Sequence, residues 1–147
     1  MVKKVKDDII RLGKERINIT QIKEEKKYYS LHDLEEQEEL ISDAIVKSVN
    51  LYKKASNVNF ATSTSTLMGA VFVLASQNPI AKIIFLTAQI GSLIAQIKSS
   101  VIMTKSKKAA TDLMKLNSEV KQDILQKRFE EYEKMAAEIF KDIESEA

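Results

Sequence analysis

The chain has 147 residues, of which 30% are charged, and its 23 basic and 21 acidic side chains give a formal charge of +2. This length fits one domain or one long hairpin, and the nearly balanced charge argues against a nucleic-acid partner. Cysteine is absent, which excludes disulfides, thiolate metal sites and cysteine nucleophiles. Three glycines and one proline predict long helices with few turns.

Residues 1–29 are expected to form a short N-terminal helix and a connection. A helix is predicted from Val2 to about Arg16, because apolar residues recur there at spacings of three and four. These residues are Val2, Val5, Ile9 and Leu12. The isoleucines between residues 17 and 22 alternate, which fits either a short strand or an extended connection. The charged residues near Met1 leave no apolar core for a signal peptide, so we expect a cytoplasmic N-terminus.

Residues 30–147 are predicted to form an antiparallel hairpin of two long helices, which makes the fold class all-α. Ser30, with Asp33 three residues later, is a typical helix start, because the hydroxyl can accept a backbone N–H and the acid faces the positive end of the helix dipole. No breaker follows before the turn near Gln77–Pro79. Pro79 suits the first position of the next helix, which we expect to continue toward the C-terminus.

The C-terminal part of the second long helix carries a coiled-coil-like pattern. Its apolar residues alternate at spacings of four and three, which is typical of a seam in a coiled coil or a bundle. They are Leu125, Phe129, Tyr132, Ala136, Ile139 and Ile143. We therefore expect an amphipathic stalk below the hairpin turn.

The tip of the predicted hairpin is uncharged and apolar. No charged residue occurs from Ala55 to Ala81, and as helices the segments 58–77 and 80–97 approach the hydrocarbon thickness of a bilayer, about 30 Å. Lysines flank both segments on the side away from the turn, which predicts two membrane spans with cytoplasmic termini. Polar residues between 59 and 66 make the apolar signal marginal, whereas Lys82 is close enough to the turn to snorkel to the far interface.

Two patterns within the tip predict contacts. On a helical projection the polar residues of the second segment fall within an arc of about 100°. This polar stripe consists of Lys82, Gln89, Ser92, Gln96, Ser99 and Ser100. It is interpreted either as the lining of a polar lumen in an oligomer or as the contact between the two helices of one hairpin. In the first segment Ala61, Ser65 and Gly69 recur every four residues, a pattern that lets membrane helices approach closely.

No catalytic, cofactor-binding or metal-binding constellation is present in the sequence. His32 is the only histidine, so neither a Glu-x-x-His motif nor a nucleophile–base pair can be assembled. The glycines are isolated from one another, which excludes a glycine-rich phosphate loop. We therefore expect a protein that is not an enzyme and uses no cofactor.

Residues 49–143 resemble a known family. Tyr-Lys-Lys-Ala at 52–55 leads into the first apolar segment, and Gly-Ser-Leu-Ile-Ala at 91–95 lies near the end of the second. The lysine-rich stretch 105–108 then leads into residues 109–116. This arrangement is similar to that of the SLATT proteins, two-transmembrane effectors associated with SMODS and SLOG sensors. The resemblance implies a homo-oligomer in the bacterial inner membrane, contacting lipid and a cytoplasmic sensor or regulatory protein, that acts as a pore in antiphage defence or inter-microbial conflict.

Two functions therefore stay open from the sequence. The first is an oligomeric membrane effector built from inserted hairpins. The second is a soluble, all-α interaction or surface-coating protein, similar in kind to phasins and located in the cytoplasm, whose apolar tip is buried in an oligomer.

Overall fold

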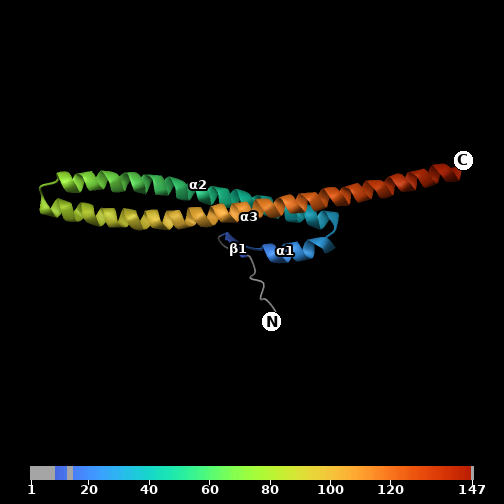
Figure 1. Cartoon of the computed structure of the whole chain (residues 1–147), viewed down its shortest axis with the longest axis horizontal. Coiled ribbons are helices and arrows are strands. Elements are labelled where there is room, and N and C mark those ends of the chain that lie inside the picture. The colour runs from blue at the N-terminus through green and yellow to red at the C-terminus, as the bar shows by residue number, and fades with distance from the viewer. Residues whose placement is uncertain (1–8, 13–14, 147) are drawn as a thin grey trace, which may run out of the picture. The chain divides into compact units, whose positions relative to one another are not determined.

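The computed structural model describes residues 9–12 and 15–146. The elements in chain order are β1 (Ile9–Leu12), β2 (Glu15–Asn18), α1 (Ile19–Glu25), a 3-10 helix η1 (Lys26–Tyr28), α2 (Leu31–Ala75) and α3 (Pro79–Glu146). Helices α2 and α3 pack against each other as a hairpin, as Figure 1 shows. The predicted helical hairpin is therefore confirmed.

Both long helices begin where the sequence predicts, because each start is fixed by local side-chain capping. The N–H of Asp33 donates to Ser30 Oγ at 3.2 Å, and the N–H of Ser30 donates to Asp33 Oδ2 at 2.8 Å. The Ser30 hydroxyl also donates to Asp33 Oδ2 at 2.6 Å, and this bond, together with the one from the Ser30 N–H, holds the pKa of Asp33 below its usual value. At the second start Asn78 Oδ1 accepts the N–H of Ile80 at 2.9 Å, and Pro79 occupies the first helical position.

The N-terminal segment differs from the prediction of a helix from Val2 to about Arg16. Residues 2–8 lie outside the described part, and β1 pairs with β2 in an antiparallel register that places Ile10 opposite Ile17. A short N-terminal helix is present, but it is α1, at Ile19–Glu25. The helical spacing was misleading because β-branched residues favour strands and because pairing packs Ile10 and Ile17 against the core.

The chain divides into two compact units. The terminal unit comprises Met1–Ile45 and Thr111–Ala147, and the turn unit comprises Val46–Ala110. The long helices α2 and α3 contribute to both units, so each unit contains a pair of antiparallel helical segments.

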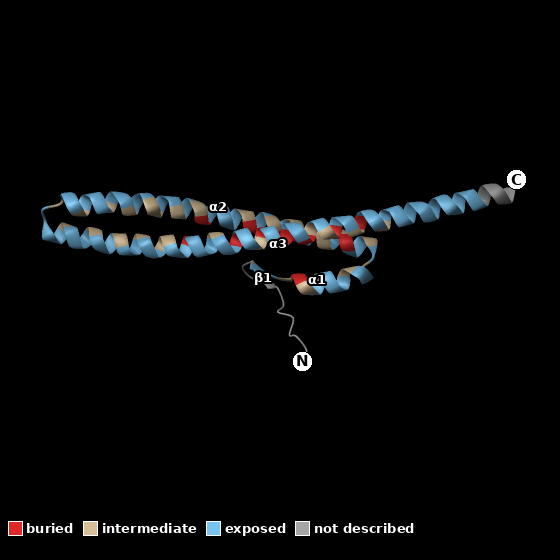
Figure 2. Cartoon of the chain, in the orientation of Figure 1, coloured by how far each residue is buried: buried red, intermediate tan, exposed pale blue. Residues whose placement is uncertain are grey.

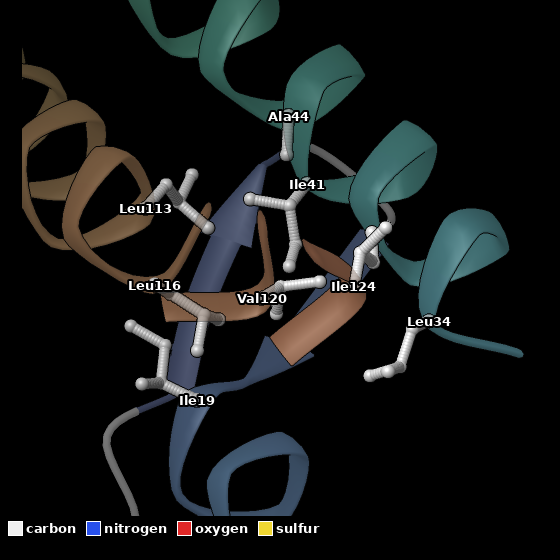
Figure 3. Close-up of a cluster of buried hydrophobic side chains, with 8 residues drawn as sticks. All are labelled: Ile19, Leu34, Ile41, Ala44, Leu113, Leu116, Val120 and Ile124. Carbon is white, nitrogen blue, oxygen red and sulfur yellow. The ribbon is translucent and has the colours of Figure 1, made fainter. Parts of the chain in front are cut away.

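The terminal unit has an ordinary hydrophobic core. Its buried cluster draws on α1, α2 and α3 and is shown in Figure 3. It consists of Ile19, Leu34, Ile41, Ala44, Leu113, Leu116, Val120 and Ile124. Ion pairs join the N-terminal helices to α3: Lys23 of α1 pairs with Glu119 at 2.9 Å, and Lys26 of η1 pairs with Asp123 at 2.6 Å. This unit therefore has the polarity of a water-soluble helical domain.

The predicted C-terminal seam is not part of this core. Leu125, Phe129, Tyr132 and Ile139 are exposed on α3, whereas the intramolecular core uses residues that precede them. Ala136 is exposed as well, and the burial of Ile143 lies outside the described part.

Candidate functional site

Hydrogen bonds donated by polar side chains to side chains and backbone carbonyls join α2 to α3 in the turn unit. Thr66 Oγ1 donates to Ser92 Oγ at 3.0 Å, and Ser92 Oγ donates to the carbonyl of Thr62 at 2.8 Å. Gln89 Nε2 donates to the carbonyl of Thr66 at 3.3 Å. The contact is thus made by small hydroxyls and an amide.

The same kind of contact continues away from the turn. Gln96 Nε2 donates to Ser63 Oγ at 2.8 Å. The hydroxyls of Ser99 and Ser100 each donate to Asn59 Oδ1 at 3.2 Å. These residues and those above form the polar seam: Asn59, Thr62, Ser63, Thr66 and Gly69 of α2, with Gln89, Ser92, Gln96, Ser99 and Ser100 of α3.

Gly69 brings the two helices close together within the polar seam. A Cβ atom at this position would lie 3.0 Å from Gln89 Cγ and 3.1 Å from Gln89 Nε2, which is tighter than nine in ten Cβ contacts, so the Gln89 side chain would have to shift. The glycine at 91 differs, because a Cβ atom there would meet nothing within 4 Å. The helix contact therefore favours a residue without a Cβ atom at Gly69, whereas Gly91 lies on an open face.

The structure places most of the polar stripe against α2. Gln89, Ser92, Gln96, Ser99 and Ser100 all donate hydrogen bonds toward that helix, as expected if the stripe is the contact within one hairpin. A lumen lined by these groups would require them to leave their acceptors on α2. The remaining member of the stripe, Lys82, is exposed and lies outside the polar seam.

The small-residue contact predicted in the first segment is only partly correct for this hairpin. Gly69 contacts α3, but Ala61 and Ser65 are exposed and lie outside the contact. The physical reason is the spacing. The helix contact alternates between four and three residues, as in coiled coils, and a strict repeat of four drifts away from it.

The outer surface of the turn unit is apolar. Figure 2 shows that residues on both sides of the α2–α3 turn are exposed or half-buried. The exposed large side chains include Phe60, Leu67, Met68, Val71, Phe72, Leu74, Ile80, Ile83, Ile84, Leu86, Ile90, Leu93, Ile94 and Ile97. Leu74 is 85% exposed. The turn unit thus has polar groups inside and apolar groups outside, which is the opposite of the arrangement in the terminal unit.

Four of the five hydroxyls in the serine and threonine run at 62–66 are hydrogen-bonded to a carbonyl of their own helix. Thr62 Oγ1 donates to the carbonyl of Val58 at 2.8 Å, and Thr64 Oγ1 donates to that of Phe60 at 3.0 Å. Ser63 makes the same contact to Asn59 at 2.8 Å. Such bonds to the preceding turn satisfy hydroxyls within their own helix, so the run fits a nonpolar environment better than its composition indicates.

The charged residues of the turn unit are all lysines. They are Lys47, Lys53, Lys54, Lys82, Lys98, Lys105, Lys107 and Lys108, and no aspartate or glutamate occurs from Val46 to Ala110. Except for Lys82, which follows the turn, they flank the apolar segments on the side of the termini. We call the exposed residues Lys53, Lys54, Lys98, Lys105 and Lys108 the basic collar.

Two helices, Leu31–Ala75 and Pro79–Lys141, are long and apolar enough to cross a membrane, and no residue of their most apolar 18-residue windows is buried. Within residues 9–12 and 15–146, no group of three or more His, Asp or Glu side chains is placed to hold a metal ion. Comparisons with protein families, curated proteins and solved structures found no match for this chain.

Proposed function

We propose that this protein is a membrane-inserted helical hairpin whose turn unit spans a bacterial inner membrane and whose termini are both cytoplasmic. The observation that carries the proposal is the reversed polarity of Val46–Ala110, with a polar seam inside and apolar side chains outside. In lipid the hydrophobic effect does not drive helices together. Close packing of small residues and interhelical hydrogen bonds hold such helices instead, which fits this arrangement.

The energetic argument favours lipid over water around the turn unit. Burying a leucine, isoleucine or phenylalanine side chain gains about 1.5–3 kcal/mol relative to leaving it exposed. The exposed apolar residues belong to both helices, so one neighbouring helix could cover only part of them. A bilayer surrounds the hairpin and covers every face, and Lys82 lies near enough to the turn to reach the far interface.

The proposal includes self-association through the C-terminal stripe of α3. This stripe consists of the exposed apolar residues Leu125, Phe129, Tyr132, Ala136 and Ile139. Insertion with one topology makes α3 parallel in neighbouring copies. In a parallel coiled coil with Phe129 and Ala136 at a positions and Tyr132 at d, Met135 of one copy would meet Phe140 of the next. Both of these side chains are apolar and exposed. The residues that flank the C-terminal stripe could therefore also pack against a second copy.

The effector role in antiphage defence, under control of a cytoplasmic sensor, rests on the resemblance of residues 49–143 to the SLATT proteins. The polar seam argues for a specific form of this role. Because Gln89 and Gln96 already donate within the hairpin, any pore would be formed between hairpins by residues other than these amides.

Membrane insertion is tested by fractionating cells that express the full chain. We expect the protein to stay in the membrane pellet after carbonate extraction and to dissolve only in detergent. A variant in which residues 67–74 are replaced by a polar helix-forming sequence should move to the soluble fraction. A wild-type protein that is monodisperse in plain buffer would refute insertion and favour the soluble, surface-coating alternative.

Self-association is tested by cysteine cross-linking, because the natural chain contains no cysteine. Leu125→Cys and Ile139→Cys lie at opposite ends of the stripe, and Lys134→Cys lies on the opposite face as a control. A parallel pair predicts disulfide-linked dimers for both stripe variants and none for the control, because a disulfide requires close Cβ atoms. Equal linking of all three variants would indicate random collision in place of a defined contact.

A further inference from the structure

A groove runs along one side of the helix pair in the turn unit, where the basic collar meets the apolar surface. It encloses about 340 Å³. Helix α2 contributes Leu51, Lys54, Ala55 and Val58, and α3 contributes Ala95, Lys98, Ser99 and Ile102. On each helix these residues are spaced by three, one and three positions, so they form one continuous face.

The lining surface of this groove is entirely apolar, and the only charged residues that border it are two lysines, which contribute their aliphatic stems to the lining. Leu51, Val58 and Ile102 are partly exposed along it, which leaves apolar surface accessible from outside. Lys54 and Lys98 line it from opposite helices. Since Val46–Ala110 contains no aspartate or glutamate, no carboxylate of this unit neutralises the two ammonium groups.

We propose that this groove binds one anionic phospholipid, with the phosphate between Lys54 and Lys98 and an acyl chain along the apolar walls toward Val58. The inference rests on the proposed membrane insertion, which places the groove at the cytoplasmic interface. There the lysine stems cover apolar surface while the ammonium groups reach the headgroup layer. A phospholipid matches the two lysines and the apolar lining together, whereas a free phosphate matches only the charges and a neutral phospholipid lacks the net charge.

The test uses the full chain purified in detergent, with phosphatidylglycerol as the probe and native mass spectrometry of lipid adducts as the readout. We expect a saturable adduct with phosphatidylglycerol and a much weaker one with phosphatidylcholine of the same acyl chains. Excess inorganic phosphate should not displace the lipid. Equal binding of the two lipids, or displacement by phosphate, would overturn the proposal.

Charge-matched variants separate a site from general attraction. At about fivefold per lysine, Lys54→Gln with Lys98→Gln should weaken the phosphatidylglycerol adduct by about 25-fold. Lys53→Gln with Lys105→Gln removes the same charge from the basic collar outside the groove and should weaken it by less than about threefold. Equal weakening by both pairs would show a diffuse effect of charge and refute the groove.

The apolar half of the groove is tested separately by Ala95→Phe, which fills it without changing charge. We expect loss of the phosphatidylglycerol adduct with an unchanged helical circular dichroism spectrum. A retained adduct would refute acyl-chain binding. Membrane fractionation of the same variants keeps this inference distinct from the proposed function: an integral membrane protein without a lipid adduct refutes only the groove, and a soluble wild-type protein refutes insertion itself.

Discussion

Replacing both Gln89 and Gln96 with leucine should weaken the helix pair of the turn unit while leaving membrane insertion intact. The two amides donate to α2, at 3.3 Å from Gln89 to the Thr66 carbonyl and at 2.8 Å from Gln96 to the hydroxyl of Ser63. Leucine removes these bonds and increases the apolar surface, so the transfer of the helix into lipid becomes more favourable.

The size of the effect follows from the two bonds. Interhelical hydrogen bonds in membrane proteins contribute about 0.6 kcal/mol on average and at most about 1.7 kcal/mol. The short Gln96 bond belongs near the upper value and the longer Gln89 bond near the mean, so the double variant should lose about 2 kcal/mol of unfolding free energy. Because leucine and glutamine have similar volumes, little of this loss would come from a cavity.

The measurement is unfolding of the full chain in mixed micelles, followed by far-ultraviolet circular dichroism as the fraction of denaturing detergent rises. Thr87→Leu is the control, since its hydroxyl is exposed and donates only to the Ile83 carbonyl of its own helix, at 2.9 Å. The control should change the unfolding midpoint little. An unchanged midpoint for the double variant would refute a stabilising role of the two amides in the polar seam. If cells that overexpress this variant also showed less ion leak than cells with the wild-type protein, the result would support a pore lined by the amides.

Three further outcomes are expected. Gly69→Leu should destabilise the helix pair by about 1–3 kcal/mol through overpacking, whereas Gly91→Leu, on an open face, should be tolerated; equal unfolding midpoints would contradict the close contact. Leu116→Ala should cost about 2–5 kcal/mol in thermal unfolding of the terminal unit, because this side chain is fully buried. The pKa of Asp33 is lowered from 3.8 by hydrogen bonds from Ser30, so its stabilising effect is complete above that pH and is lost as the pH falls through the lower, folded-state pKa. The stability difference between wild type and Asp33→Ala, measured from pH 7 downward, should therefore shrink only below pH 3.8, and a constant difference would contradict the assignment.

The parts of the fold that depend on local chemistry could be predicted from the sequence. The starts of α2 and α3 follow from Ser30 and Pro79 with their immediate neighbours, so no tertiary information was needed. The β-hairpin at Ile9–Asn18 could not be predicted in this way. Its strands are stabilised by packing Ile10 and Ile17 against residues distant in sequence, and such tertiary contacts override a helical spacing.

The residues of the candidate site could be predicted from the sequence, but the surface that they contact could not. Periodicity alone places Gln89 and Gln96 on one face of α3, yet a single helix contains no information about what that face contacts. The acceptors on α2 lie in the hydroxyl-rich run that weakened the membrane signal in the sequence. Once Thr62 and Thr66 are seen to pair with α3, the same residues support insertion.

The bonding of the seam hydroxyls has a consequence for how the hairpin is assembled. Thr62 and Thr66 can each donate to a carbonyl of their own helix, at 2.8 Å to Val58 and at 2.9 Å to Thr62, so they keep an acceptor when α3 is absent. The amides of Gln89 and Gln96 have no such bond among those observed and reach their acceptors across the pair. In the proposed membrane state, α2 could therefore enter the bilayer with these two hydroxyls already bonded, whereas α3 gains the bonds of Gln89, Ser92 and Gln96 only when it packs against α2.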